Sequence, residues 1–478
     1  MLWVNRALQV VAALVFLSVL AAALHDVSYA WDVWYYHLPF AARVAGVVPA
    51  GSFVFHPANQ ARYEGYPLFG ELLEGVLWRA TGRPESASLV SFACIPMFAW
   101  FLRRRFAVPL HVSVLALLAI PLVQAHASSC YVDLPANTAV AVLVLLAVEA
   151  HARRSTRVGG GTLALAGAAA AVAVNTKVLA GPLVLAALVA LGTRVGPDLA
   201  RDLRTDGRRR ARWTLAALTL AALVVFATPL KNVALHHNPF FPEKISILGH
   251  ELPGVEEPYS SSPRYLAHAP EPVRFACSVL EIGIRPLTDR RRWTVDQFMP
   301  ADSTGPRMGG FFGAYVIAEL AMLGWQLLRD RSGKAKAIGA GFALLTALTS
   351  VMPQAHELRY YLAWMIVLVA MNRWLACTGK TDASRANVLV GTVSLAALVV
   401  VVVVTHGAYA YPSGSTFAEL VGEKVDARAL DRIGDGEQVC VRKAPWNLLW
   451  APEFHAPRRY VVREAEEEGE CEGARPVD

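Results

Sequence analysis

The sequence predicts an α-helical polytopic membrane protein with roughly eleven transmembrane helices, and three observations support this fold class. Hydrophobic residues occupy 55% of the 478 positions. Charged residues occupy 17% of them, whereas soluble proteins average about 25%. The apolar residues are also gathered into segments close to the length of about 20 residues that a membrane-spanning helix needs.

Eleven segments are apolar enough for a hydropathy window of about 19 residues to select them. They cover residues 7–24, 86–102, 107–125, 135–150, 161–175, 178–193, 213–230, 310–328, 337–352, 360–376 and 387–405. The first segment follows a single early Arg and resembles a signal peptide. Because further spans follow it, we expect it to remain as the first transmembrane helix.

Clusters of Lys and Arg predict the orientation of these helices. Such clusters favour the cytoplasmic side of a membrane, and here they recur in alternate connections, at residues 103–105, 151–157, 201–212, 329–336 and 379–385. The N-terminus is then cytoplasmic. The opposite side receives two long outer loops, residues 25–85 and 231–309.

The formal net charge of +7 has two explanations. A nucleic-acid-binding surface combines basic residues with interleaved aromatic ones, and the sequence has no such stripe. Arginines that flank membrane spans produce the same sum. We therefore expect contact with membrane lipids and none with nucleic acid.

The chain divides into a predicted transmembrane catalytic domain, residues 1–405, and a polar tail, residues 406–478. The segments "EQVCVRK" and "RRYVVRE" in the tail are typical of short strands. They predict a small extracytoplasmic α/β domain. Cys440 and Cys471 both lie there, on the side of the membrane where a disulfide can persist, and the sequence leaves their pairing open.

Residues 66–84 of the first outer loop predict a helix that lies in the membrane interface. The segment is too polar to span, yet it has an apolar side at helical spacing, which is typical of interfacial helices. That side holds Leu68, Leu72, Val76 and Leu77.

The conspicuous polar residues gather at the predicted outer ends of the helices. They are Asp26, Asp32, His37, Asp133, Lys177, Lys231, His236, His237, His356, Glu357 and Arg359. Each alone is compatible with an ordinary solvated end of a span. Lys177 stands out because it lies between two short apolar spans, and an ionisable group near membrane depth is a functional hypothesis by default.

Together these groups match the chemistry of transfer from a lipid phosphate. A carboxylate at the membrane surface can deprotonate an acceptor hydroxyl. Lysine and arginine at the same depth can hold the leaving phosphate and stabilise its growing negative charge. The aromatic residues of "WDVWYYHLP", residues 31–39, can stack on a sugar or line a lipid groove.

The order of these motifs resembles a known family. An acidic residue in "WDVWYYHLPFAARVAG" is followed by "EGYPLFGELLEG", a second acidic site in "YVDLP", a lysine at a short turn, and "HELRYY". Over most of residues 1–405 this is similar to the GT-C superfamily of polytopic glycosyltransferases. Within it, the protein O-mannosyltransferase and lipid A aminoarabinose transferase group of bacterial membrane enzymes is most similar.

The resemblance implies a transferase of the bacterial plasma (inner) membrane whose active site faces the periplasm or exterior. It implies a polyprenyl-phosphate-linked sugar donor, transfer of a hexose or pentose with inversion, and an envelope acceptor. Glycolipid, glycan and protein all remain open as that acceptor.

The resemblance also implies roles for individual residues. The catalytic carboxylate of the first outer loop matches Asp32 or Asp26, and the motif favours Asp32, with Asp133 as the second acidic site. The donor phosphate would bind Lys177, Arg359 and Lys231. The substrate contacts would be Trp31, Tyr35, Tyr36, His37, Glu71, His356 and Glu357. Many family members carry paired acidic residues in this loop, whereas Asp32 is followed by Val33 and Trp34.

That departure leaves the base and any metal requirement open. No cofactor is certain, but a divalent metal is an alternative, because imidazole and carboxylate suit several metals. The candidate ligands are His25, Asp26, Asp32, His37, His236 and His237.

Two rival functions remain. A lipid or sugar transporter, or a flippase, would place its charges near the bilayer midplane, often within internal repeats. Here the charges cluster at one face and no repeat is visible, which argues against transport. A non-catalytic membrane scaffold would bind a partner through the tail, with Trp446 and Trp450 as contacts.

Overall fold

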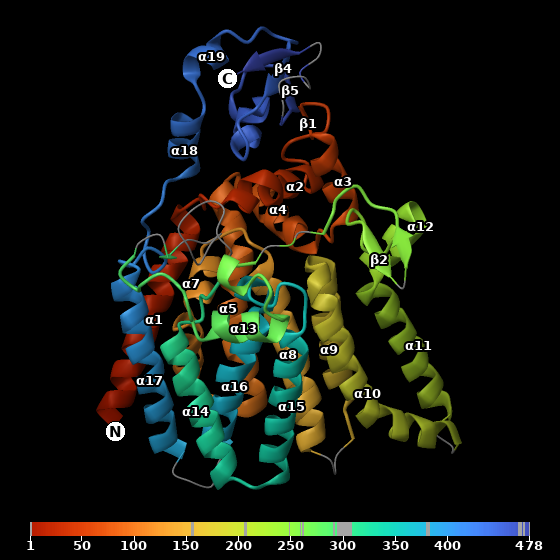
Figure 1. Ribbon diagram of the computed structural model, residues 1–478, viewed down its shortest axis with the longest axis vertical. Coiled ribbons are helices and arrows are strands. Elements are labelled where there is room, and N and C mark those ends of the chain that lie inside the picture. Colours follow the sequence, from red (N-terminus) through yellow and green to blue (C-terminus); the bar gives the residue numbers. More distant parts are fainter. Residues whose placement is uncertain are drawn as a thin grey trace.

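The computed structural model describes residues 2–153, 157–204, 208–247, 249–258, 260, 262–289, 292–293, 308–378, 383–466, 471 and 474–477. Three layers follow one another along the longest axis (Figure 1). A bundle of long helices forms one end, a small sheet with short helices forms the other, and the first outer loop lies between them.

The bundle contains helices in all eleven predicted segments. Its helices are α1 (Leu2–His25), α5 (Leu89–Phe106), α6 (Leu110–Leu118), α7 (Pro121–Ala127), α8 (Asp133–Ala152), α9 (Gly160–Thr176), α10 (Gly181–Arg204), α11 (Arg208–Val225), α12 (Ala227–His236), α14 (Gly313–Arg329), α15 (Gly333–Ser350), α16 (Leu362–Thr378) and α17 (Ala383–Val404). The spans that contain α8 and α16 are 78% and 89% buried, whereas that of α1 is 28% buried. The middle of the bundle is therefore formed by α8 and α16, and α1 faces its surroundings.

A test of length and hydropathy on the described residues selects fewer spans than the eleven apolar segments. Within the described ranges, six helices are long and apolar enough to cross a membrane, or eight if each bent pair counts as one span. The bent pairs are α6–α7, at 97°, and α11–α12, at 61°. Helices α9 and α14 have only 17 residues each. Lysines at positions 334 and 336 lower the hydropathy of α15.

The first outer loop folds into a layer of short elements over the bundle. They are η1 (Val33–His37), α2 (Leu38–Val44), β1 (Phe53–Val54), α3 (Pro57–Gly65), α4 (Phe69–Thr81) and η2 (Pro84–Ser88). The second long loop contributes β2 (Ile245–Ile247), β3 (His250–Leu252), η4 (Arg264–Leu266) and α13 (Glu271–Val279).

Helix α4 occupies the segment in which an interfacial helix is predicted. Leu72, Leu73 and Val76 are exposed on one side, whereas Glu71 and Glu74 are buried on the other. A helix at a membrane interface places its apolar side in lipid. The two carboxylates consequently turn toward the protein.

The tail forms the predicted small α/β unit. It contains α18 (Phe417–Lys424), α19 (Ala427–Asp431), β4 (Gln438–Val441), η7 (Trp446–Trp450), η8 (Pro452–Phe454), β5 (Val461–Glu464) and β6 (Arg475–Val477). Both predicted strand segments are confirmed as β4 and β5. The disulfide that the sequence left open is formed between Cys440 and Cys471.

The sheet of the tail includes a strand from the first outer loop. Its order is β1-β5-β4-β6, all parallel, and Phe53 pairs with Val462. Trp34 and Trp78 of the first loop also belong to the same apolar cluster as Trp450 of the tail. The division at residue 405 remains a prediction, and residues on both sides of it share one core.

Candidate active site

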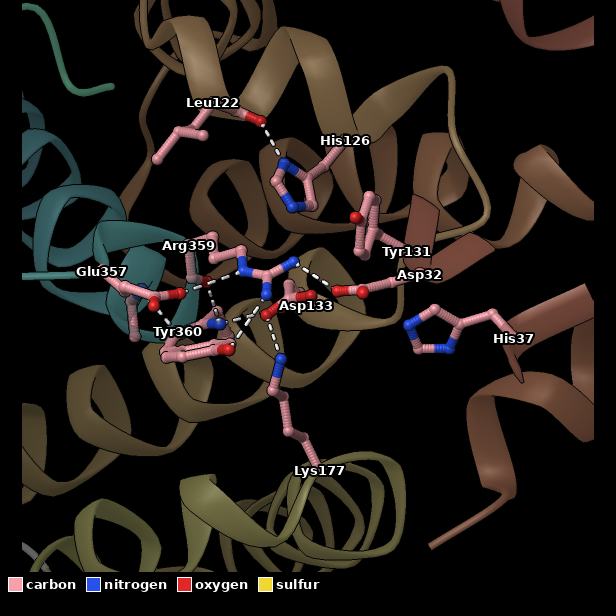
Figure 2. Close-up of polar contacts among 12 residues, drawn as sticks. Asp32, His37, Leu122, His126, Tyr131, Asp133, Lys177, Glu357, Arg359 and Tyr360 are labelled. Carbon is pink, nitrogen blue, oxygen red and sulfur yellow. Dashed lines mark hydrogen bonds and ion pairs between the residues drawn. The ribbon is translucent and has the colours of Figure 1, made fainter. Parts of the chain in front are cut away.

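Four charged side chains from four separate segments meet between the first loop and the bundle (Figure 2). We call Asp32, Asp133, Lys177 and Arg359 the charge quartet. Arg359 Nη1 donates to Asp32 Oδ2 at 2.8 Å, and Lys177 Nζ donates to Asp133 Oδ1. The structure thus brings together the two favoured carboxylates and two of the three predicted phosphate ligands.

Helix ends position one ion pair of the quartet. Asp133 is the first residue of α8, and Lys177 follows the last residue of α9, before η3 (Val178–Ala180). A helix N-terminus stabilises a negative charge and a helix C-terminus a positive one. Both residues therefore have favourable backbone electrostatics before they meet each other.

A π-helix positions Asp32. Residues Val33–His37 form the π-turn, and Leu38 N donates to Val33 O five residues earlier. Such turns are rare and occur often at functional sites, because the extra residue changes which side chains share a face. Asp32, at the start of this turn, points toward Arg359, and His37, at its end, lies beside it (Figure 2).

Two tyrosines pack against the cations of the quartet. Lys177 Nζ lies 4.3 Å from the centre of the Tyr360 ring. Arg359 Cζ lies 4.8 Å from the same ring and 5.5 Å from that of Tyr131. Aromatic faces attract cations at these distances. Neither tyrosine was among the predicted site residues, although each adjoins a predicted polar residue in "YVD" or "LRYY".

The members of the quartet differ in how far they are buried. Asp133 is completely buried, whereas the side chains of Lys177 and Asp32 keep 18% and 13% of their surface exposed. Within the described residues, Asp133 Oδ2 has no hydrogen-bond partner. A ligand would therefore approach from the side of Asp32 and Lys177, and Asp133 would act from behind.

Asn137 joins two of the four segments that carry the quartet, and the sequence reasoning missed it. Its Nδ2 donates to Asp133 O at 2.8 Å and to Arg359 O at 3.3 Å. Its Oδ1 accepts from Ala363 N at 3.0 Å. Because side chains four residues apart share a helix face, the spacing from Asp133 was the signal that could have identified it.

His37 forms part of a second buried cluster. Its Nδ1 lies 2.8 Å from Glu71 Oε1, and its ring lies 5.5 Å from that of Tyr131. Glu74 lies one helical turn beyond Glu71 and is fully buried. Neither oxygen of Glu74 has a hydrogen-bond partner in the described part of the chain. Burial first, and then the charge of Glu71, raises the pKa of Glu74 well above its usual value.

Other predicted substrate contacts lie around the quartet. Glu357 Oε2 is 3.5 Å from Arg359 Nε, and buried His356 lies 3.8 Å from Glu271 of α13. Tyr36 stacks near His37, with ring centres 4.3 Å apart. Burial, and then the charge of Asp32, raises the pKa of Tyr36.

Trp31 and Tyr35 lie farther along the first loop. Trp31 is exposed, and its ring centre is 6.0 Å from that of Tyr35. The Tyr35 hydroxyl donates to Glu466 of the tail. Burial, and then this hydrogen bond, raises the pKa of Tyr35 to about 12.

Two predicted residues lie in other contacts. Asp26 pairs with His25 at 2.9 Å and accepts a hydrogen bond from Ser413 N at 3.1 Å, which ties it to the start of the tail. Lys231 lies in α12 and donates to Glu64 O. Of the two candidate bases, the structure places Asp32 beside the predicted phosphate ligands.

The alternative metal ligands do not come together. Among the described residues, no group of three or more His, Cys, Asp or Glu side chains could hold a metal ion. His236 stacks on Phe241, with ring centres 3.7 Å apart. The Asp32 and Asp133 carboxylates each face a basic side chain. These residues do not fit a divalent-metal site.

The fold is similar to that of solved structures. No family model and no curated protein match the chain. The crystal structure of ArnT from Cupriavidus metallidurans in the apo state aligns with a TM-score of 0.52 and 13% identity, over 95% of this chain and 85% of that one. The structure of the same ArnT bound to undecaprenyl phosphate aligns with a TM-score of 0.52 and 12% identity, over 96% and 89%. The protein is a polytopic helical membrane protein whose fold is similar to that of ArnT.

Proposed function

We propose that the protein is a glycosyltransferase that moves a sugar from a polyprenyl-phosphate-linked donor to an envelope acceptor. The charge quartet supports this function, because it offers two adjacent cations and a partly exposed carboxylate at one place. ArnT, whose fold is similar, has been solved with undecaprenyl phosphate bound. That likeness supports a lipid phosphate as the group that the cations receive.

The positions of the charges support the following reaction. The donor phosphate binds Lys177 and Arg359, whose charges stabilise the leaving polyprenyl phosphate as the bond from the sugar to the phosphate oxygen breaks. The acceptor hydroxyl forms the new bond to the same sugar carbon from the opposite face. Its proton passes to the carboxylate of Asp32. The products are the inverted glycoside, polyprenyl phosphate and protonated Asp32.

Asp133 has a positioning role in this proposal. It is buried behind Lys177, and Asn137 holds its helix against the segment of Arg359. When phosphate binds, Lys177 interacts with two negative groups instead of one. Asp133 therefore keeps the ammonium at the depth at which the donor phosphate arrives.

We place the reaction on the extracytoplasmic face of a bacterial plasma membrane. The basic clusters of the sequence support that orientation. The connection between α14 and α15, the last turn of α10 and the first turn of α11 lie at the end of the bundle away from the tail (Figure 1). The acceptor is an envelope glycolipid, glycan or protein.

Replacing Asp32 tests the proposal. Cells that lack the protein are complemented with wild-type chain, Asp32→Asn, Asp26→Asn or Glu257→Gln, and their envelope lipids and glycans are compared by mass spectrometry. Loss of a general base lowers rates by about 10²–10⁴-fold. We expect one sugar to be missing from the uncomplemented and Asp32→Asn cells, and to return with the other three chains.

Two results would contradict the proposal. Full restoration by Asp32→Asn, at equal protein abundance in the membrane, removes Asp32 from the chemistry. Movement of a polyprenyl-linked sugar across proteoliposomes without a new glycoside favours the flippase instead. Glu257→Gln controls for the loss of one outer-loop carboxylate, because Glu257 is exposed and faces Lys244 at 3.7 Å.

A further inference from the structure

A cleft of about 630 Å³ lies in the tail, apart from the charge quartet. One wall is the connection between α18 and α19, and the other is the segment between β4 and η7. In Figure 1, α18 and α19 stand beside the sheet of β4 and β5. None of the residues that line this cleft takes part in the reaction proposed above.

Basic residues outnumber acidic ones in the lining of the cleft by three to two. Lys424, Arg442 and Lys443 line it, together with Glu423 and Asp426. Both carboxylates already accept hydrogen bonds from the protein. Glu423 accepts from the Tyr29 hydroxyl at 2.8 Å and from Lys424 Nζ at 2.7 Å, and Asp426 caps α19 through its Oδ1.

An aromatic surface adjoins these cations. Trp446 lines the cleft and is only partly buried. Tyr29 lies against Trp446 in an edge-on arrangement, with ring centres 5.9 Å apart. Lys424 Nζ lies 5.2 Å from the Trp446 ring and 5.7 Å from the Tyr29 ring. Indole and phenol rings offer an apolar face with a polar edge, which suits the C–H face of a sugar.

A buried donor in the same cleft lacks an acceptor. Trp450 lines the cleft and is 0% exposed. Its indole Nε1–H has no hydrogen-bond partner among the described residues. Leaving a buried donor without a partner is unfavourable, because the donor has lost its hydrogen bonds to water. A hydroxyl or acidic oxygen of a ligand would remove that cost.

Aromatic packing links the cleft to the segment that carries Asp32. The Trp446 ring packs 5.6 Å from that of Trp34, which lies in the π-helix two residues after Asp32. The Trp34 ring also stacks on Phe417 of α18 at 6.2 Å. A ligand in the cleft therefore contacts Trp446, which packs against the segment that follows the proposed base.

We propose that this cleft binds an acidic saccharide, whose sugar ring packs on Trp446 and whose carboxylate or phosphate binds Lys424 and Lys443. The Trp450 indole donates to a ring substituent. The assignment of this saccharide as part of the acceptor rests on the proposed function, whereas its binding does not. In that role the cleft holds an acidic part of the glycan acceptor at a place apart from the charge quartet.

Calorimetry on the full chain in detergent, without donor, tests the binding. Trigalacturonate and glucose 6-phosphate present a carboxylate and a phosphate on a sugar. Maltotriose is the neutral saccharide, and inorganic phosphate is the anion without a sugar. We expect at least one acidic sugar to bind tenfold or more tightly than both controls. The acidic sugar that binds identifies the anionic group.

Matched variants locate the site. The double variant Lys424→Gln/Lys443→Gln should weaken the acidic sugar at least tenfold. Lys336→Gln, which removes a positive charge from α15 at the other end of the molecule, should not. Equal binding of maltotriose and the acidic sugars, or unchanged binding by the double variant, overturns the inference.

The two proposals fail separately. If Asp32→Asn cells make the normal envelope glycans while the acidic sugar still binds, only the proposed transferase function is wrong. If the transferase is confirmed while no acidic sugar binds, only the inferred cleft is wrong. Calorimetry on the Asp32→Asn variant checks that binding of the acidic sugar is independent of the reaction centre.

Discussion

At Asp133 the protein buries a carboxylate completely and compensates its charge with one ammonium, that of Lys177. Breaking a buried ion pair by removing one partner costs more than replacing both, because the remaining charge stays desolvated. In the proposed function this pair has both a structural and a phosphate-binding role. Single and double substitutions separate these two contributions.

The first prediction concerns this pair. Lys177→Met should lower the free energy of unfolding by about 3–5 kcal/mol, because it leaves Asp133 without its partner. The double variant Asp133→Asn/Lys177→Met should recover most of that stability and still fail to bind donor phosphate. Thermal unfolding in detergent and titration with polyprenyl phosphate measure the two effects. Donor binding by the double variant would show that Lys177 is only structural.

The second prediction concerns the buried carboxylates of α4. The pKa of Glu74 is raised well above its usual value, by burial first and by Glu71 second. The folded state therefore favours the protonated form. The resulting stabilisation is fully present below the carboxyl's unfolded pKa of about 4.3 and is lost as the pH rises through the folded pKa.

Glu74→Gln keeps the shape of the protonated side chain and removes its titration. We expect the melting temperature of this variant to fall less from about pH 6 to about pH 9 than that of the wild type. Glu71→Gln is the matched comparison, because it loses the charge that faces His37 at 2.8 Å. An unchanged pH dependence in Glu74→Gln would mean that Glu74 is ionised in the folded protein.

At the scale of elements, the close packing of α2 against α4 supports the segment that positions Asp32. Gly75 faces α2, and a Cβ atom there would lie 2.7 Å from Ala45 Cβ. Only hydrogen fits at such a separation. The same packing orients Glu71 toward His37. Because His37 is the last residue of the π-helix, this contact also helps to position Asp32 at its start.

Gly75→Ala should therefore separate the two helices. Overpacking of this kind costs about 1–3 kcal/mol, and we expect a lower melting temperature together with reduced transfer. Gly192→Ala in α10 is the control, because a Cβ atom there meets nothing within 4 Å. Alanine is favoured over glycine inside a helix by about 1 kcal/mol. Equal effects of the two substitutions would contradict the role of this contact.

For the whole molecule, the parallel sheet joins the tail to the first outer loop. Strand β1 pairs with β5, β5 pairs with β4, and Cys440 in β4 is bonded to Cys471 beyond it. The tail thus covers the back of the segment that carries Asp32. Loosening the tail should affect the reaction, although no tail residue lies in the charge quartet.

Replacing the disulfide tests this connection. Cys440→Ser/Cys471→Ser opens a loop of 31 residues, and the loop-closure model predicts a loss of about 3–4 kcal/mol in the stability of the tail. We expect faster proteolysis of residues after 405, with the bundle intact, and a partial loss of transfer. Cys277→Ser is the control, because Cys277 is not in a disulfide. Unchanged transfer with a proteolysed tail would show that the tail is dispensable.

Local patterns determined much of what the structure contains. Hydropathy alone located helices in all eleven segments and the interfacial α4, because burial in lipid or at its surface imposes a composition on nearby residues. The strands β4 and β5 were visible as short runs of strand-typical residues in the tail. A hydropathy window of about 19 residues is too long to detect the bends at α6–α7 and α11–α12. It is also too long to detect the two-residue strand β1.

The sequence by itself determined that a polytopic membrane protein carries Asp32, Asp133, Lys177 and Arg359 at helix ends of one face. It also identified them as chemically suited to a lipid phosphate. Only the tertiary structure decided that Asp32, and not Asp26, meets Arg359, that Lys231 lies elsewhere, and that Tyr360 and Asn137 complete the site. The reason is physical: the pairing of charges 44 and 327 positions apart depends on long-range packing, on which local composition carries no information.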